Sequence, residues 1–191
     1  MTPFNGAHTT FPMPKMPIAE FAKDSLGTER DIVMIVDEQI RNACQEPRQM
    51  AWFVDVTIEA HPMIISNFQV SEASGDFCSR GGRFGTHASN ESMAPIFYKK
   101  VVFLSYFNAG VRAVDIRDPY HPKQIGYFIP SITETTDKRC TTINGQDNCK
   151  VAIQTNNVET DDRGYVYMVD RANTGMHILE LTGDARAIIA Q

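Results

Sequence analysis

The fold is decided by a stretch of sequence that occurs twice in the second half of the chain. Phe107–Ile116 reads FNAGVRAVDI and Ala172–Leu181 reads ANTGMHILEL, so the two segments align without gaps at an offset of 65 residues. The same offset places Val101–Leu104 on Val166–Val169. Each copy joins two runs of strand-forming residues through a three-residue link that ends in glycine. Because glycine adopts positive φ without strain, each copy predicts a β-hairpin.

A third copy of the pattern lies nearer the N-terminus. Phe53–Val56 matches Ala113–Ile116 at an offset of 60 residues, and the His-Pro pairs that follow both segments also coincide. Further upstream, Ile32–Asp37 resembles Tyr165–Asp170. The strand pattern is therefore repeated along the whole chain.

Two of these units also open alike. Gly6–Thr9 reads GAHT and Gly85–Ala88 reads GTHA, whereas the third unit has QTNN at Gln154–Asn157, without the glycine and the histidine. The shared Gly-x-His opening marks the expected first strand of each unit.

The repeat predicts an all-β protein with about three four-stranded antiparallel units in a single domain that spans residues 1–191. Units of this kind that recur at roughly 50–65 residues are typical of β-propeller blades. An antiparallel β-sandwich with accidental internal similarity is the alternative. The approximate blade limits are 6–70, 83–130 and 151–191, with an insertion at 131–150 that carries Cys140 and Cys149.

Helical patterns are short and few. The only helical candidates are Ile18–Ser25 and Glu38–Cys44. Ala185–Ala190 is expected to be the last strand of the third blade.

The residues of the second unit resemble the LVIVD-repeat family. In that pattern a glycine precedes an apolar strand, the strand ends in aspartate, and an Asp-Pro-x-x-Pro turn follows, as in Gly110–Pro122. Trp52–Pro62 matches in part, and the third unit keeps the glycine and the strand but has Glu180 at the aspartate position. The resemblance implies a β-propeller of the kind often found in exported bacterial proteins. A more distant similarity to selenium-binding proteins, which are also propellers, implies the same fold and no particular activity.

Three blades are fewer than the roughly four to eight with which propellers close. A three-bladed piece has two open flanks whose unburied surface invites association. We therefore expect the chain to be part of a longer propeller, or several copies to assemble and supply the missing blades.

The charge balance and the hydropathy argue against several kinds of partner. The chain has 18 basic and 23 acidic residues and a formal net charge of −5, which disfavours binding to nucleic acid through its phosphates. No apolar run approaches the roughly 20 residues that cross a bilayer as a helix, so no membrane span is expected. Met1–Pro17 lacks the apolar core of a secretory signal.

The four cysteines suggest two disulfides. Cys140 and Cys149 flank eight residues that contain an Asn-Gly reversal, and Cys44 and Cys78 both lie in polar loop sequence. Free thiols are the alternative for each pair. No Cys-x-x-Cys spacing is present, so the cysteines do not indicate zinc. An even number of loop cysteines favours an extracellular or periplasmic location, with the signal peptide expected upstream of this chain.

His8 and His87 are the main candidate site residues because they occupy equivalent places in two units. The first strand of a propeller blade lines the central channel, so both imidazoles are expected to face the axis, where they could hold a divalent metal or exchange protons. Glu91 and its counterpart Glu159 would add carboxylates. The alternative is structural, with each histidine bonded to a backbone group at the start of its blade.

The glycine-rich segment Arg80–Gly85 reads RGGRFG. It lacks the Lys-Ser/Thr pair and the helix that phosphate-binding loops require, so it is expected to be a loop between blades. Arg83 would then be a ligand contact at the mouth of the channel. No Gly-x-Ser-x-Gly motif is present, and no Ser/His/Asp set can be assembled by spacing.

Two functions are compatible with this sequence, and a purely structural fragment with no activity of its own is the third alternative. The first is a non-catalytic, exported propeller that binds a protein or polymer partner through its loop face, which the missing catalytic motif favours. The second is a metal-dependent oxidoreductase or hydrolase with an axial site that includes His8, His87 and Glu91. The only cofactor that the residues suggest is a divalent metal on the axis.

Overall fold

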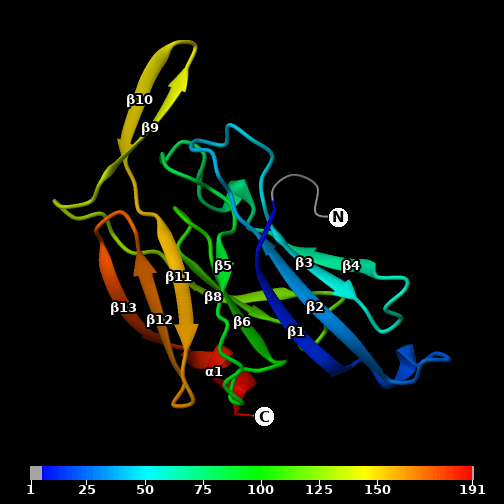
Figure 1. The fold of residues 1–191 in the computed structure, drawn as a ribbon. Helices are drawn as coiled ribbons and strands as arrows, with labels where there is room; N and C mark the ends of the chain where they lie inside the picture. Colours follow the sequence, from blue (N-terminus) through cyan, green and yellow to red (C-terminus); the bar gives the residue numbers. More distant parts are fainter. Residues whose placement is uncertain (1–5, 191) are drawn as a thin grey trace.

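A computed structural model describes residues 6–190 and shows an all-β chain with four antiparallel sheets, none of which is closed (Figure 1). We call the two four-stranded sheets sheet 1 and sheet 2, and the three-stranded sheet sheet 3. Sheet 1 contains β1 (Ala7–Pro17), β2 (Glu29–Asp37), β3 (Ala51–Asp55) and β4 (Met63–Phe68). Sheet 2 contains β5 (Ala88–Ser89), β6 (Val101–Ser105), β7 (Val111–Asp115) and β8 (Lys123–Phe128). Sheet 3 contains β11 (Thr155–Thr160), β12 (Tyr165–Asp170) and β13 (Gly175–Glu180).

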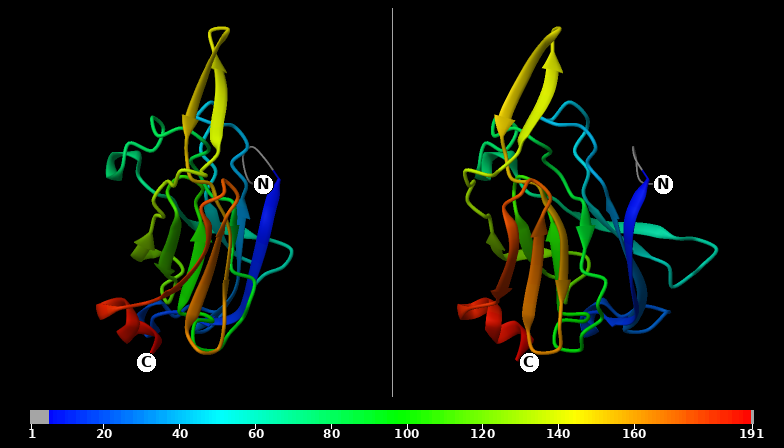
Figure 2. Two further views of the ribbon diagram at one scale, coloured as in Figure 1. Left: turned by 90° about the vertical axis from the view of Figure 1, so that its left-hand side faces the viewer. Right: turned by 60° about the vertical axis from the view of Figure 1, so that its left-hand side comes forward.

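The fourth sheet is the hairpin of β9 (Lys138–Ile143) and β10 (Gln146–Val151), which projects from the rest of the fold (Figure 2). The remaining elements are two single-turn 3₁₀ helices, Glu20–Ala22 and Glu72–Ser74, and the helix α1 (Gly183–Ile189). No helix among residues 6–190 combines the length and the apolar character that a bilayer crossing needs.

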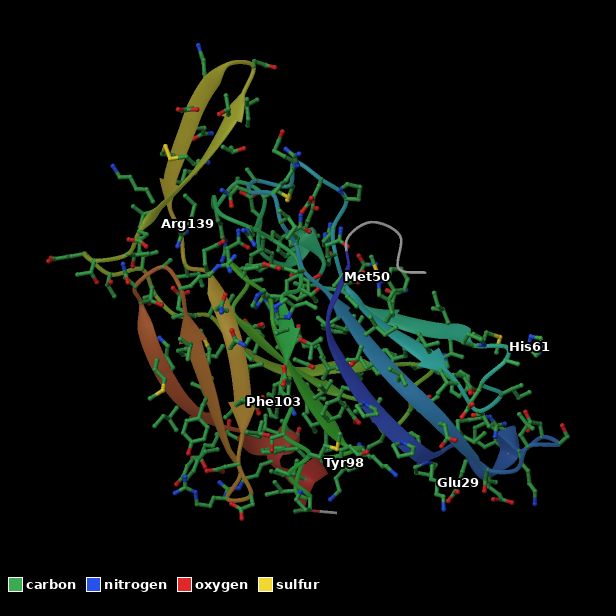
Figure 3. The ribbon with its side chains drawn as sticks, viewed as in Figure 1. Glu29, Met50, His61, Tyr98, Phe103 and Arg139 are labelled. Atoms are coloured by element: carbon green, nitrogen blue, oxygen red, sulfur yellow. A yellow bond between two sulfur atoms is a disulfide. The ribbon has the colours of Figure 1, made fainter. Side chains whose placement is uncertain are left out.

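Sheet 2 lies between sheets 1 and 3 and buries both of its faces. Along β6, Val102 and Leu104 pack against the core of sheet 1, whereas Val101 and Phe103 pack against sheet 3. Phe103 is labelled in Figure 3. Because side chains alternate along a strand, an unbroken apolar strand such as this one is buried on both sides. The three sheets therefore stack face to face through two separate cores.

The glycine-ended links form tight hairpins, as the sequence predicts. Gly110 has φ +77°, and a Cβ at this position would stand 2.1 Å from the carbonyl oxygen of Phe128. The aspartates at the strand ends organise the turns that follow them, since Asp55 Oδ1 accepts the N–H of Thr57 and Asp115 Oδ1 accepts that of Arg117. The turn chemistry of the repeat is therefore reproduced in two sheets.

The expected last strand at Ala185–Ala190 is wrong, because these residues belong largely to α1 and sheet 3 has three strands rather than four. Ala185, Ile188 and Ile189 pack against the core between sheets 2 and 3. Their spacing of three and four residues puts them on one face of a helix. This covering helix occupies a place where a fourth strand was expected.

Neither helical candidate forms an α-helix. Ile18–Ser25 contains only the single turn Glu20–Ala22, and Glu38–Cys44 is an irregular connection. In that connection Glu46 Oε1 accepts the backbone N–H groups of Ile40 and Arg41 at 2.5 and 2.8 Å. A side-chain acceptor thus satisfies donors that a helix would have bonded to its own carbonyls.

Both expected disulfides are present. Cys44–Cys78 joins the β2–β3 connection to the segment before β5, and its sulfurs pack against the core shared by sheets 1 and 2. Cys140–Cys149 links directly paired residues of the projecting hairpin. One bridge is therefore part of the main fold, and the other lies within an exposed two-stranded element.

Candidate functional site

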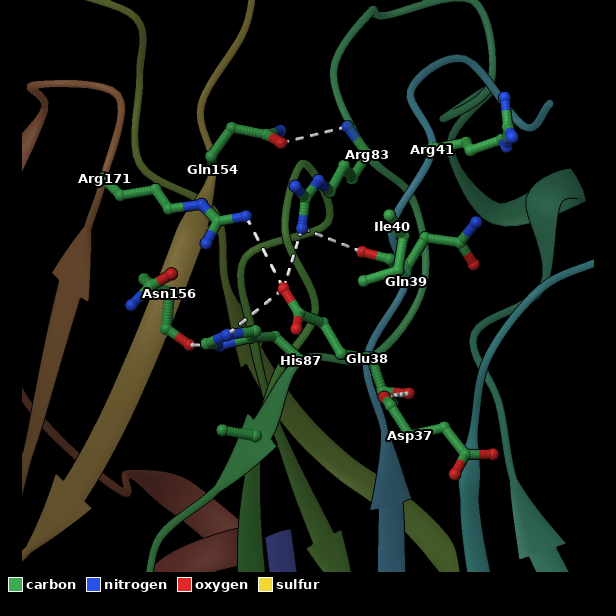
Figure 4. A network of polar contacts seen from close by, with 12 residues as sticks. Asp37, Glu38, Gln39, Ile40, Arg41, Arg83, His87, Gln154, Asn156 and Arg171 are labelled. Atoms are coloured by element: carbon green, nitrogen blue, oxygen red, sulfur yellow. Dashed lines mark hydrogen bonds and ion pairs between the residues drawn. The ribbon is translucent and has the colours of Figure 1, made fainter. Parts of the chain in front are cut away.

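The candidate site lies where the first strands of the three sheets come together. β1 and β11 both lie against β5, and His8, His87 and Asn156 stand at or beside the beginning of these three strands. The ends of β2 and β12 reach the same place and contribute Glu38 and Arg171. Figure 4 shows the resulting polar network around His87 and Glu38.

His87 is the buried centre of this network, and only 5% of its side chain is exposed. Its Nδ1 lies 2.5 Å from the backbone oxygen of Asn156. Because a carbonyl oxygen can only accept, Nδ1 carries the proton and Nε2 keeps a free lone pair when the ring is neutral. Burial lowers the pKa of His87, and the nearby His8 lowers it further, whereas the hydrogen bond to Asn156 and the charge of Glu38 oppose the shift. The ring is therefore held neutral with Nε2 available as a ligand atom.

His8 lies on the exposed side of the same ring. The two imidazole centroids are 4.3 Å apart, with an angle of 44° between the ring planes. His8 Nδ1 is 3.1 Å from Thr9 Oγ1. The structure thus brings together the two histidines that the sequence pairs by their equivalent places.

Hydrogen bonds between the end of β2 and the segment before β5 position Glu38. Gln39 N–H donates to the carbonyl oxygen of Thr86, and the Thr86 hydroxyl donates to that of Asp37. Glu38 Oε1 consequently lies 3.7 Å from His87 Nε2. One ligating atom each from His8, Glu38 and His87 falls within 4.8 Å of the other two.

Two arginines flank the carboxylate of Glu38. Arg83 Nη1 lies 2.8 Å from Glu38 Oε1, and Arg171 Nη2 lies 3.8 Å from the same oxygen. Both guanidinium groups also lie over the ring of Phe107, at 5.2 and 5.0 Å from its centroid. Phe107 is fully buried and its ring is 5.1 Å from that of His87, so a single aromatic platform supports the three cationic or ligating groups.

The glycine-rich segment before β5 is a tightly packed connection. A Cβ on Gly82 would stand 2.3 Å from Gln154 Nε2, and a Cβ on Gly85 would stand 2.5 Å from Gln39 Oε1. The N–H of Arg83 donates to Gln154 Oε1. These glycines let the loop approach sheets 1 and 3 closely, and this approach carries the Arg83 side chain to Glu38.

The carboxylates expected from Glu91 and Glu159 are not part of this cluster. Glu159 accepts the N–H groups of Glu91 and Ser92, and so fixes the chain that leaves β5. The carboxylate beside the histidines is that of Glu38. Glu91 was expected there because it closely follows His87 in sequence, but the chain runs away from the cluster along β5.

Glu38, Arg171 and Asn156 are the site residues that the sequence interpretation missed. The repeat contained a signal for them, since the match of Ile32–Asp37 with Tyr165–Asp170 makes Glu38 and Arg171 equivalent. Asn156 holds the place in the third unit that His8 and His87 hold in the first two. The site is therefore built from repeated positions that carry a different residue type in each unit.

A second group of ligand-type residues consists of Cys44, Glu72 and Cys78, but both sulfurs are joined in a disulfide. It therefore offers no thiolate to a metal. Comparison of the sequence with protein-family models and with curated proteins gave no match.

Proposed function

We propose that His8, Glu38 and His87 bind a divalent transition-metal ion at the junction of the three sheets. The observation that carries this proposal is the orientation of the buried His87, whose Nδ1–H is held by the Asn156 carbonyl while Nε2 faces Glu38. In metal sites, a hydrogen bond at the second nitrogen of this kind fixes the tautomer and the ring plane of a ligating histidine. A lowered pKa keeps the ring unprotonated, as a metal ligand must be.

The donor set agrees with known preferences of metal ions. Two imidazoles and one carboxylate bind zinc in hydrolytic sites and ferrous iron in oxygen-dependent sites, and they leave coordination positions open. A bound ion would act as a Lewis acid toward a ligand in those positions. The proposal therefore includes metal-dependent catalysis, hydrolytic or oxidative, at an axial site.

Metal titration of the purified protein tests this assignment. We expect one Zn²⁺ or Co²⁺ ion to bind per chain, with affinity weakened at least tenfold in Glu38→Gln and in His8→Ala, whose ring is exposed so that its loss leaves the fold intact. His121→Ala is the matched control, because this histidine is 84% exposed and pairs only with Asp118 among residues 6–190. Undiminished binding in both site variants, or no binding by the unaltered protein, would overturn the proposal.

We also propose that sheets 1–3 are consecutive blades of an LVIVD-type β-propeller that binds a protein partner. The support is that both outer sheets have an apolar face that belongs to neither of the two cores among residues 6–190. In sheet 1 this face carries partly buried residues at paired positions, namely Val33, Ile35, Trp52 and Val54. In sheet 3 the corresponding face carries Tyr165, Val169, Met176 and Ile178, each at least 40% exposed.

These faces lie on the flanks of the stack and not on its loops, so the structure favours the flanks over the loop face as the partner surface. Further blades or another copy of the chain would bury them. Sedimentation velocity tests this: we expect concentration-dependent association that Val54→Asp weakens and the exposed-charge control Lys123→Asp leaves unchanged. A monodisperse, stable monomer would contradict the proposal. The two disulfides support an exported, oxidising location for this assembly.

A further inference from the structure

The arrangement of Arg171 beside the histidines points to the class of ligand that this site takes. Within residues 6–190 its guanidinium donates no hydrogen bond, and its one ion-pair partner is Glu38 Oε1 at 3.8 Å. The side chain is 35% exposed, so part of its donor edge is accessible. Arginine has five N–H donors in a rigid planar fork that matches the paired oxygens of a carboxylate or a phosphate.

The fork is held in place without using its donors. The guanidinium of Arg171 lies 5.0 Å from the centroid of the Phe107 ring, which is completely buried. This cation–π contact holds the guanidinium without a hydrogen bond from its N–H groups. Arg171 is therefore oriented before a ligand arrives, which reduces the entropy lost on binding.

The two carboxylates near Arg171, those of Glu38 and Asp170, already have other partners. Glu38 is shared with Arg83, whose Nη1 is 2.8 Å from Oε1. Asp170 also lies close, but its two oxygens accept the backbone N–H groups of Gln154 and Ala172, both at 2.6 Å.

We propose that the site of His8, Glu38 and His87 also binds a small oxyanion, a carboxylate or a phosphate group, whose paired oxygens would be held by the Arg171 fork beside the proposed metal ion. The inference rests on the proposed metal site, because Arg171 lies 3.8 Å from Glu38, one of the proposed ligands. It assigns Arg171 as the residue that determines ligand specificity and leaves Arg83 to hold Glu38.

Calorimetric titration of the Zn²⁺-loaded protein with oxalate and, separately, with inorganic phosphate tests this assignment. We expect at least one of the two to bind, and Arg171→Met to weaken that binding about 10- to 100-fold, the range of a charged hydrogen-bonded pair. Binding of oxalate alone would identify a carboxylate ligand, and binding of phosphate alone a phosphate ligand. Arg171→Lys keeps a charge above Phe107 but removes the fork, so we expect it to be impaired as well.

Zn²⁺ affinity measured without oxyanion separates this inference from the metal site itself. We expect neither Arg171 variant to weaken Zn²⁺ binding, because arginine is not a ligand and its positive charge, 3.8 Å from Glu38, opposes that of the metal ion. Arg186→Met, on the exposed surface of α1, is the control for general charge effects. Oxyanion binding that is equal in the unaltered protein and both Arg171 variants, or absent despite bound zinc, would overturn the inference alone. Failure to bind zinc would overturn the metal site and this inference together.

Discussion

Removal of the Cys44–Cys78 disulfide should destabilise the whole protein, whereas removal of Cys140–Cys149 should affect only the projecting hairpin. The first bridge closes a loop of sequence separation 34, and the second closes one of 9. In the chain-entropy model, cross-links of these lengths stabilise the folded state by about 3.8 and about 2.6 kcal/mol at 25 °C. The two values differ little, so loop length alone does not distinguish the bridges.

Their surroundings do distinguish them. Cys44 and Cys78 pack against the core of sheets 1 and 2, so the unfolding of that core and the opening of the 34-residue loop are one event. The β9–β10 hairpin is a separate two-stranded sheet, and most of its side chains are exposed. Such an element unfolds locally with a free energy of its own. We therefore expect Cys44→Ala/Cys78→Ala to lose about 4 kcal/mol of global stability, and Cys140→Ala/Cys149→Ala less than about 1 kcal/mol.

Urea denaturation followed by the fluorescence of Trp52 measures the global free energy of unfolding, because this is the only tryptophan of the chain and lies in β3. For a chain of this length, about 4 kcal/mol corresponds to a decrease in Tm of roughly 8–16 °C. Limited proteolysis under native conditions reports the hairpin, and we expect faster cleavage there only in the Cys140/Cys149 variant. Equal losses of global stability in the two variants would refute the distinction drawn from packing.

Three further predictions concern single residues. Gly110→Ala should lower the free energy of unfolding by about 3 kcal/mol or more, because the strain of a positive φ and a collision with the Phe128 carbonyl add together. The control Gly145→Ala has the same φ of +77° but open space around its Cβ, so it should lower this free energy by about 1 kcal/mol. Urea midpoints measure both losses. The pKa of His87 is lowered on folding, so the stability of the fold does not depend on this histidine's protonation above pH 6.5 and decreases as the pH falls below 6.5, where the unfolded chain binds the proton more readily. His87→Gln should flatten this pH dependence of the free energy of unfolding in denaturation curves between pH 7.5 and 5. An unchanged slope would contradict the assignment. Arg112 is 2% exposed, its Nε and Nη2 have no hydrogen-bond partners among residues 6–190, and burial lowers its pKa to about 10. Arg112→Met should therefore raise the free energy of unfolding by about 1–2 kcal/mol. A loss of stability would show that the contacts of Arg112 with aromatic rings stabilise the fold by more than the burial of its charge costs.

The strands and turns could be predicted because the repeat combines two independent local signals. Alternating apolar residues define the strands, and glycine or aspartate at fixed places defines the turns, as at Gly110 and Asp115. Both signals are encoded within about ten residues, so no knowledge of tertiary contacts was needed. The Cys140–Cys149 bridge belongs to the same category, because the Asn-Gly turn pairs the two strands that carry it. Cys44–Cys78 spans 34 residues and depends on tertiary contacts as well.

The last element and most of the site could not be predicted in this way. Ala185–Ala190 is short and apolar, and such a run does not distinguish a buried strand from a helix that covers a core. Glu38 follows a strand directly and was assigned to a short helix, while its true partners, Arg83 and Arg171, are remote in sequence. Long-range pairing of this kind depends on how the sheets stack, which one-dimensional periodicity does not contain.

The projecting hairpin gives the fold a place where sequence can be exchanged freely. Its two strands enter and leave at neighbouring points, and the Cys140 and Cys149 Cα atoms are only 4.0 Å apart. A peptide epitope, a fluorophore or a tether inserted at Asn144–Gly145 would extend away from both cores, while the bridge isolates the insertion from the stacked sheets (Figures 1 and 2). The chain thus offers a built-in attachment point for immobilising the protein.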